Sequence, residues 1–450
     1  QLIDKAFHKI AAPSGQVKSF LVFNTTSWVR SELVKIPAVW KAAGMAVFDE
    51  KGKAQTTQTL STGELAFVAK NIPPFSAARF TLKKQKRQKW QPPSVTLDGL
   101  TLANELLTVK IDGTTGAVAS LRHRDLPFDL VDADDRYGFN EYWYTGANAA
   151  NPARSRNPVI KIKEHGRLVA SFLVESDAPG AHFFSREIQL TAGLNQVDIL
   201  NTVDKKRVYE DENLRFSFPF HVPDGQVRMD LAWALMQPEK DQLKGANKNF
   251  FCAQHFVDIS NPAYGITWAN LDAPLVETGE MHGQRWMSDP ATEPWLKTWT
   301  PSNRLFSWVM NNVWFVNYKG HQEGLVPFRY AIRPHRGFDS AEAKKFGIGL
   351  VQPLLVAPVA EGQPGFSSML KLSGDPAVII TCLKPARDGK GYLVRLFNTS
   401  DRTAAATLQW GGNGQPKWFL SNEKEKVFEE VKGQVTLGAW EIKTLRVMGK

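Results

Sequence analysis

Apolar and polar residues alternate with a period of two along most of the chain, which is the pattern of strands that bury one face. The alternation is clearest in residues 106–111, 160–163, 167–174 and 214–220, and an aromatic strand is expected at 308–318. Gly, Pro, Asn and Asp separate these segments, as at the turn signal Asp112-Gly113. We therefore predict an all-β protein built from antiparallel β-sandwiches.

Helical periodicity is confined to two short segments. Apolar residues between positions 2 and 10 line one face of a helix at 2–11, which has no visible start and resembles the tail of a preceding helical domain. Residues 340–346, closed by Gly347, form a second helix with Ser340 as its N-cap. We expect less than about 10% helix, against roughly 30–35% in typical soluble proteins.

The length of 450 residues suggests about three domains, at roughly 150 residues each. We predict a helical tail at 1–15, a small β-sandwich unit at 16–90, a large β-sandwich at 91–360 and a C-terminal β-sandwich unit at 361–450. The first and last β-units share one local pattern, a strand ending in Asn24-Thr25 or in Asn398-Thr399. A common Asn turn explains this similarity more simply than duplication does.

Composition and charge exclude several classes of protein. The chain is 43% hydrophobic and 22% charged, which is ordinary for a globular protein and excludes a mostly disordered one. No apolar run approaches the ~18–20 residues of a membrane span, so no membrane partner is expected. The two cysteines cannot form a disulfide framework, and no CxxC motif suggests structural zinc.

The net charge of +10 raises the question of a nucleic-acid partner. The densest basic run, residues 83–89, leads into Trp90-Gln91-Pro92-Pro93 and has the composition of a linker. No helix-turn-helix, zinc-finger or RNA-recognition signature accompanies it. We therefore expect no nucleic-acid partner.

The sequence shows little catalytic chemistry of its own. It contains no nucleophile elbow, P-loop, dinucleotide fingerprint or HExxH motif, and its nine histidines lack ligand spacing. The acidic clusters at 132–135 and 210–212 contain the carboxylates that a glycosidase pair requires, but exposed loop charges are the favoured interpretation.

The segment at 239–279 is the most specific part of the chain. It contains Asp241-Gln242-Leu243, Lys248-Asn249-Phe250-Phe251, Val257-Asp258-Ile259-Ser260-Asn261, Gly265-Ile266-Thr267-Trp268 and the run from Leu271 to Glu277. These motifs resemble the C-terminal region of the α-mannosidases of glycoside hydrolase family 38, in particular bacterial members. Shorter stretches at 20–28, 139–144 and 328–332 fit in order, so the resemblance extends from about residue 16 to 450.

The resemblance implies both a fold and a parent activity. Members of this family are retaining, zinc-dependent glycosidases with an N-terminal catalytic domain, a three-helix bundle and a β-rich C-terminal half. That half contains a galactose-mutarotase-like supersandwich, expected here at 91–360, flanked by smaller β-sandwiches. Because only that half is matched, residues 1–15 would be the tail of the bundle. The zinc and the nucleophile would lie in the missing part, and this span alone would be inactive.

The same resemblance implies partners and site residues. The partners would be the N-terminal catalytic domain of the same polypeptide and a mannose-containing oligosaccharide, while homo-oligomerisation stays open. A tyrosine from an early supersandwich strand contacts the sugar in such enzymes, which indicates Tyr142, with Tyr144 as a close alternative. Arg285 is the candidate for an arginine that also reaches the pocket. For any one of these aromatic residues taken alone, core packing is the favoured interpretation.

Two further expectations follow. If a catalytic domain covers this region, an aromatic patch around Phe139, Tyr142, Trp143 and Tyr144 should be uncovered on the chain. The alternative function is a free-standing carbohydrate-binding module of mutarotase-like fold, in which some of the 14 tryptophans stack on sugar rings. The chain lacks a starting Met and a visible signal peptide, so periplasmic, extracellular and cytoplasmic locations all remain open.

Overall fold

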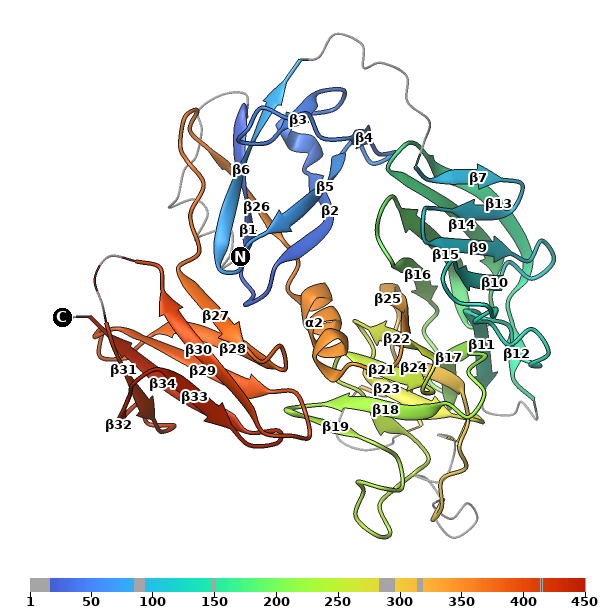
Figure 1. Ribbon diagram of the computed structural model, residues 1–450. Helices are drawn as coiled ribbons and strands as arrows, with labels where there is room; N and C mark the ends of the chain where they lie inside the picture. Colours follow the sequence, from blue (N-terminus) through green and yellow to red (C-terminus); the bar gives the residue numbers. More distant parts are fainter. Residues whose placement is uncertain are drawn as a thin grey trace. The chain divides into compact units, whose positions relative to one another are not determined.

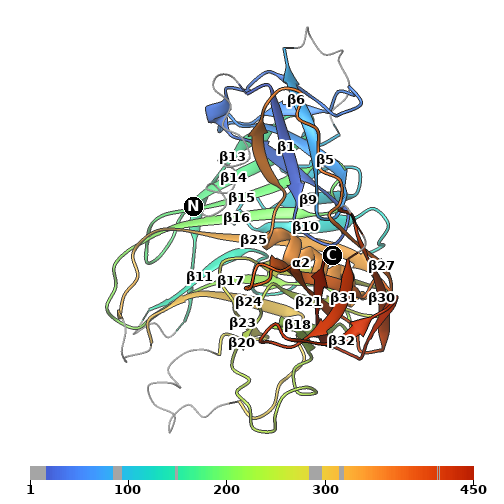
Figure 2. The same ribbon diagram turned by 90° about the vertical axis from the view of Figure 1, so that its left-hand side faces the viewer.

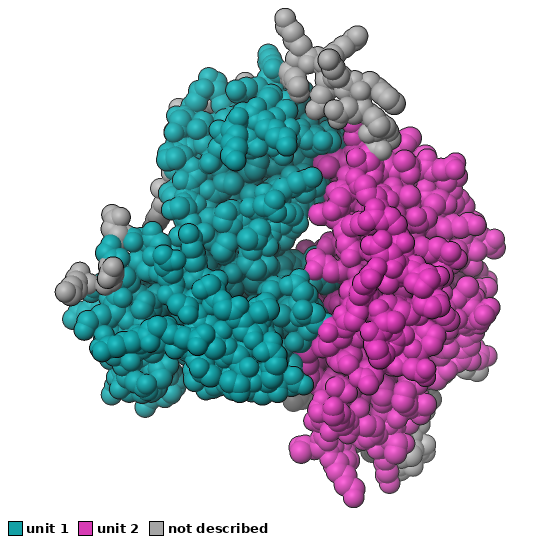
Figure 3. All heavy atoms as spheres, viewed as in Figure 1, with its two compact units in different colours: residues 1–91, 339–450 teal, residues 92–338 magenta. Residues whose placement is uncertain are grey.

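The computed structural model of the protein describes residues 17–84, 94–146, 151–282, 296–313, 319–412, 414 and 416–449 (Figure 1). Among these residues strands account for 54% and helix for 4%, which confirms the predicted all-β fold with very little helix. The chain forms two compact units, Gln1–Gln91 with Asp339–Lys450 and Pro92–Phe338 (Figure 3). We call them unit 1 and unit 2.

Unit 2 contains a nine-stranded antiparallel sheet (Figures 1 and 2). Its strands in spatial order are β13 (Arg156–His165), β14 (Val169–Asp177), β15 (Ala181–Thr191), β16 (Val197–Lys205), β25 (Gly324–Arg336), β22 (Tyr264–Asn270), β21 (Phe256–Ser260), β18 (Gln226–Leu231) and β19 (Ala234–Met236). The long strand β25 lies between β16 and β22, so the last strand of the unit joins two groups of sequential strands.

Two smaller antiparallel sheets complete unit 2. The six-stranded sheet has the order β12 (Ala153–Arg154), β11 (Glu141–Gly146), β17 (Glu212–Pro219), β24 (Arg304–Asn311), β23 (Leu275–Thr278) and β20 (Phe251–Cys252). The four-stranded sheet has the order β10 (Val118–His123), β9 (Leu107–Ile111), β8 (Thr101–Ala103) and β7 (Thr96–Asp98).

The core of unit 2 lies between the six-stranded and the nine-stranded sheet. Because side chains alternate along a strand, Leu214, Phe216 and Phe218 of β17 all point toward the nine-stranded sheet. The ring of Phe218 packs against Trp268 at 5.1 Å and Tyr330 at 5.0 Å, measured between ring centroids. These contacts make the pair of sheets a true sandwich with an aromatic core.

The same alternation contradicts the predicted uncovered aromatic patch. Phe139 and Tyr142 are 1% and 0% exposed, and Trp143 and Tyr144 are half-buried. Tyr142 faces the core beside Phe184, at 4.8 Å between ring centroids, and Trp143 packs on the ring of Tyr137 on the opposite face. Both faces of β11 are therefore occupied within unit 2 itself, and the expectation of an exposed patch is wrong.

Unit 1 contains two pairs of small antiparallel sheets. The first pair has the orders β26 (Leu355–Val359), β1 (Ser19–Asn24), β6 (Ser76–Lys83), β3 (Ala46–Phe48) and β2 (Arg30–Ile36), β5 (Leu65–Ile72), β4 (Thr57–Thr59), with the 3-10 turn η1 (Ala38–Trp40). Phe20, Phe67 and Phe80 form the centre of the core between these two sheets. Strand β1 pairs with β26, which comes more than 300 residues later in the chain.

The second pair of sheets in unit 1 lies near the C-terminus of the chain. The orders are β27 (Leu370–Gly374), β30 (Ala404–Trp410), β33 (Gln434–Leu437) and β28 (Val378–Pro385), β29 (Tyr392–Asn398), β34 (Ile442–Met448), β31 (Lys417–Ser421), β32 (Val427–Val431). Alternate residues of both sheets, such as Leu370, Leu396 and Leu445, form one apolar core.

The α-helix that the structure describes is α2 (Ser340–Val351), which was predicted at 340–346. Its N-cap is Asp339 rather than Ser340, because the Asp339 carboxylate accepts from the backbone N–H groups of Ala341 and Glu342. The helix continues past Gly347. Within the described ranges no helix is long and apolar enough to cross a membrane. The helix predicted at 2–11 and residues 85–89 of the basic run lie outside the described residues.

Candidate functional site

The structure separates the two tyrosines that the sequence could not distinguish. Tyr142 is fully buried, and its hydroxyl donates a hydrogen bond to the backbone carbonyl of Pro179. Burial raises the pKa of this hydroxyl, which is therefore neutral at physiological pH. This placement favours core packing for Tyr142, because a sugar could reach its hydroxyl only if the core opened.

Tyr144 lies two residues further along β11, in a polar cluster with Glu212 and Lys205. Its hydroxyl donates to Glu212 Oε2 at 2.8 Å, and Lys205 Nζ lies 2.6 Å from Glu212 Oε1. Burial, together with the hydrogen bond and charge of Glu212, raises the pKa of Tyr144. The neutral hydroxyl can therefore donate to Glu212 and still accept one hydrogen bond from a ligand.

A glycine fixes the position of the Tyr144 ring. Gly180, in the turn between β14 and β15, has a φ of +71°, and a Cβ atom there would lie 2.4 Å from Tyr144 Cε2. Glycine adopts this left-handed backbone without steric cost and leaves room for the ring. The turn therefore holds Tyr144 against the buried pair of Lys205 and Glu212.

Asn312 ties together the loops around this cluster. Its side-chain oxygen accepts from the backbone N–H of Glu212 at 2.5 Å, and its amide donates to the carbonyls of Val208 and Glu210. On the surface of the same loops, Tyr209 is 58% exposed and its ring lies 4.7 Å from that of His321. We call Tyr144, Lys205, Glu212, Tyr209 and His321 the β17-start site, because Glu212 is the first residue of β17.

A second polar layer lies on the face of the six-stranded sheet that points away from the core. Arg215 and Glu277 form a bidentate ion pair in which both side chains are fully buried. The guanidinium also lies 5.0 Å from the ring centroid of Trp308. Removing either partner of such a buried pair would leave the other charge buried and uncompensated. Neither of the two side chains is exposed in the described part of the chain.

The remaining sequence candidates have different outcomes. Arg285 lies outside the described residues. Glu212 is 4% exposed and forms an ion pair with Lys205. The interpretation of residues 210–212 as exposed loop charges therefore does not hold for Glu212. Sequence reasoning did not single out Lys205, Tyr209 or His321. Within the described part of the chain, no group of three or more His, Cys, Asp or Glu residues could hold a metal ion.

Comparison with known protein families gave two matches in one family. The model of the glycosyl hydrolases family 38 C-terminal domain matches residues 102–273. The model of the family 38 C-terminal beta sandwich domain matches residues 377–445. A search of curated proteins gave no match.

Among solved structures, the chain is similar to an alpha-mannosidase from Enterococcus faecalis V583, with a TM-score of 0.73 at 14% identity. The match covers 98% of this chain and 58% of that one. A glycosyl hydrolase family 38 protein from Enterococcus faecalis matches with a TM-score of 0.70 at 15% identity, over 96% of this chain and 58% of that one. The chain thus shares their fold and spans less than two thirds of their length.

Proposed function

Because the chain belongs to glycosyl hydrolase family 38, whose C-terminal domain models match more than half of it, we propose that it is the non-catalytic C-terminal part of a retaining α-mannosidase-like glycoside hydrolase acting on α-mannosides. The observation that carries the proposal is the match of two C-terminal domain models of one family within one chain. In this proposal residues 1–15 end a helical bundle, and the three β-domains are those predicted at 16–90, 91–360 and 361–450. The large one ends at Phe338, because α2 and β26 belong to unit 1, where β26 pairs with β1.

The proposed partner is an N-terminal catalytic domain of the same polypeptide, and the substrate is a mannose-containing oligosaccharide. That domain would supply the attacking carboxylate of a retaining mechanism and would bind the zinc ion. The span itself would shape the rim of the sugar pocket. Hydrolysis of an aryl α-mannoside by the longer polypeptide, with none by the 450-residue chain, is the expected result.

Within this proposal, Tyr144 is the sugar-contacting tyrosine, and Arg285 keeps its proposed role at the pocket. Tyr144 is supported by its half-buried ring and by the acceptor capacity that its hydroxyl retains beside Glu212. Tyr142 lacks this capacity for a ligand because its hydroxyl is enclosed in the core. The two tyrosines therefore form a matched pair for mutation.

The test compares Tyr144→Phe with Tyr142→Phe in the longer polypeptide. Loss of one sugar contact made in the transition state should lower kcat/KM about 10-fold for Tyr144→Phe, equivalent to about 1.4 kcal/mol. Tyr142→Phe should leave both kinetic constants unchanged and lower the free energy of unfolding by about 1 kcal/mol, because it removes a buried hydrogen bond.

Two results would overturn these assignments separately. Unchanged kinetics in Tyr144→Phe would remove this residue from the sugar pocket without affecting the family assignment. A longer polypeptide that hydrolyses no α-mannoside, or a gene without an upstream catalytic domain, would refute the proposed function itself.

A further inference from the structure

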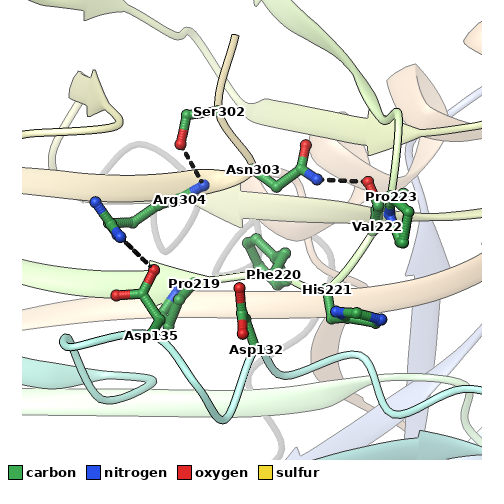
Figure 4. A pocket seen from close by; sticks show the side chains of 10 residues that line it. All are labelled: Asp132, Asp135, Pro219, Phe220, His221, Val222, Pro223, Ser302, Asn303 and Arg304. Atoms are coloured by element: carbon green, nitrogen blue, oxygen red, sulfur yellow. Dashed lines mark hydrogen bonds and ion pairs between the residues drawn. The ribbon is translucent and has the colours of Figure 1, made fainter.

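Unit 2 contains a pocket of about 310 Å³ at the end of β17 that is opposite to the β17-start site (Figure 4). Its polar lining comes from Asp132, Asp135, His221, Ser302, Asn303 and Arg304. At ~3.3 Å per residue, the eight residues of β17 separate the two places by roughly 23 Å. The pocket is therefore not part of the Tyr144 surroundings.

Backbone hydrogen bonds hold the walls of this pocket in place. The N–H of Asp132 donates to the carbonyl of Pro219 at 3.1 Å, and the N–H of Phe220 donates to the carbonyl of Asn303 at 3.1 Å. The Asn303 side-chain amide donates in turn to the carbonyl of Val222. Three separate chain segments are thus joined into a pre-formed site, which lowers the entropic cost of binding.

One carboxylate of the pocket is neutralised internally. Arg304 Nε lies 2.6 Å from Asp135 Oδ2, and the guanidinium lies 5.0 Å from the ring centroid of Tyr137. Arg304 Nη1 also donates to the carbonyl of Gly279 and to Glu280. Arg304 and Asp135 therefore shape the wall, and little of the Arg304 charge is left to attract an anion.

The other polar groups are available to a ligand. Asp132 Oδ1 accepts only a long hydrogen bond of 3.2 Å from the N–H of Asp134, and no described residue binds Asp132 Oδ2. The Ser302 hydroxyl oxygen accepts from the N–H of Arg304, which leaves its hydrogen to donate. His221 is exposed, and no described residue hydrogen-bonds its ring. Asp132 and His221 both line the pocket, and Figure 4 shows their side chains together with that of Asn303.

This combination selects the chemistry of the ligand. A carboxylate acceptor beside a hydroxyl and an imidazole matches vicinal hydroxyl groups, each of which both donates and accepts a hydrogen bond. A net negative site disfavours anions, and the volume is at the lower end of small-molecule pockets. We propose that this pocket is an ancillary subsite for one pyranose unit of an α-mannoside. This identification of the sugar rests on the proposed function.

The test measures binding to the 450-residue chain by calorimetry and by saturation-transfer NMR, with methyl α-mannoside and an α-linked mannotriose as probes. Asp132→Asn should weaken binding at least about 10-fold, the effect of losing a charged hydrogen-bond acceptor. Asp134→Asn, in the same loop but outside the lining, is the matched control and should bind as the unchanged chain does. His221→Ala, at an exposed position, should weaken binding several-fold and guards against a folding defect in Asp132→Asn.

Three outcomes would overturn the subsite: no binding of either mannoside, equal binding by Asp132→Asn, or equal losses in Asp132→Asn and Asp134→Asn. A response of the His221 ring signals to Ca²⁺ but not to mannosides would likewise overturn it, since the pocket would then bind a cation. These outcomes are separate from the fate of the proposed function. Hydrolysis of an aryl α-mannoside by the longer polypeptide together with no binding here would reject the subsite alone.

Discussion

The contact between Gly180 and Tyr144 gives a prediction that can be measured against a matched control. A Cβ at Gly180 would lie 2.4 Å from the Tyr144 ring, whereas a Cβ at Gly193 would meet nothing within 4 Å. Both glycines have a φ of +71° and both lie in turns beside β15. Alanine at Gly193 therefore measures the backbone strain alone, and alanine at Gly180 adds the clash with the ring.

The expected magnitudes follow from these two contributions. A non-glycine residue in the left-handed region costs roughly 1–2 kcal/mol, so Gly193→Ala should lower the free energy of unfolding by that amount. Overpacking adds typically 1–3 kcal/mol, so Gly180→Ala should cost about 2–5 kcal/mol in total. For a unit the size of unit 2, each kcal/mol corresponds to roughly 2–4 °C in Tm.

Differential scanning calorimetry of the two variants tests this difference in stability. In the longer polypeptide, Gly180→Ala should also lower kcat/KM, because the displaced ring moves the hydroxyl of Tyr144, while Gly193→Ala should not. Equal losses of stability in both variants would show that the ring yields freely, and the argument that Gly180 positions Tyr144 would then fail.

Two further predictions concern buried charges. Glu212→Gln should lower the free energy of unfolding by about 3–5 kcal/mol, because Lys205 stays buried without a carboxylate partner. Glu210→Gln, at an exposed position, should change it by less than about 0.5 kcal/mol. Similar Tm values for the two variants would contradict this. Burial lowers the pKa of His335, but its hydrogen bond to Asp258 and the charge of that carboxylate outweigh this and raise it above 6.5. The charged His335 ring therefore stabilises the fold fully below pH 6.5, and this contribution is lost as the pH rises through the higher pKa of the folded state. If an NMR titration of His335 gave a pKa at or below 6.5, this predicted pH dependence would be wrong.

Local patterns explain why the strands and one type of turn could be predicted from the sequence. Strands β1 and β29 both end at an asparagine, Asn24 and Asn398, as the shared pattern indicated. In each case the side-chain oxygen accepts from the backbone N–H and the hydroxyl of the residue two positions later, Thr26 or Ser400. These contacts span two residues, so the neighbouring sequence contains all the information that they require.

The alternation of buried and partly buried residues along β16 also predicts the orientation of a charged side chain. Alternate residues from Val197 onward are buried, and this series includes the polar residues Asn201 and Lys205. The period of two therefore predicts that the Lys205 side chain points inward and needs a partner. Which partner it finds could not be predicted, because Glu212 is brought there by the loop that follows β16 and by the pairing of β17 with β11 and β24.

The pairing of strands that lie far apart in the sequence could not be predicted from local patterns. Strand β1 pairs with β26, so that Phe23 lies opposite Leu355, and no local feature of either segment encodes this partner. Both segments are short apolar strands that could pair with many others in the chain. Only the complete set of strand pairings selects this register, as expected for sheets dominated by non-local contacts.

The burial of β17 explains where this unit can carry ligand-binding chemistry. All eight residues of the strand are buried, with the aromatic core on one face and the layer of Arg215 and Glu277 on the other. A ligand could reach the middle of the strand only by displacing one of these layers. Among the residues that the structure describes around this strand, the accessible polar groups singled out above therefore lie at its two ends, near Glu212 and near Pro219. Because the buried length of β17 separates them, Tyr144→Phe and Asp132→Asn test independent sites. The effect of one variant therefore does not predict the effect of the other.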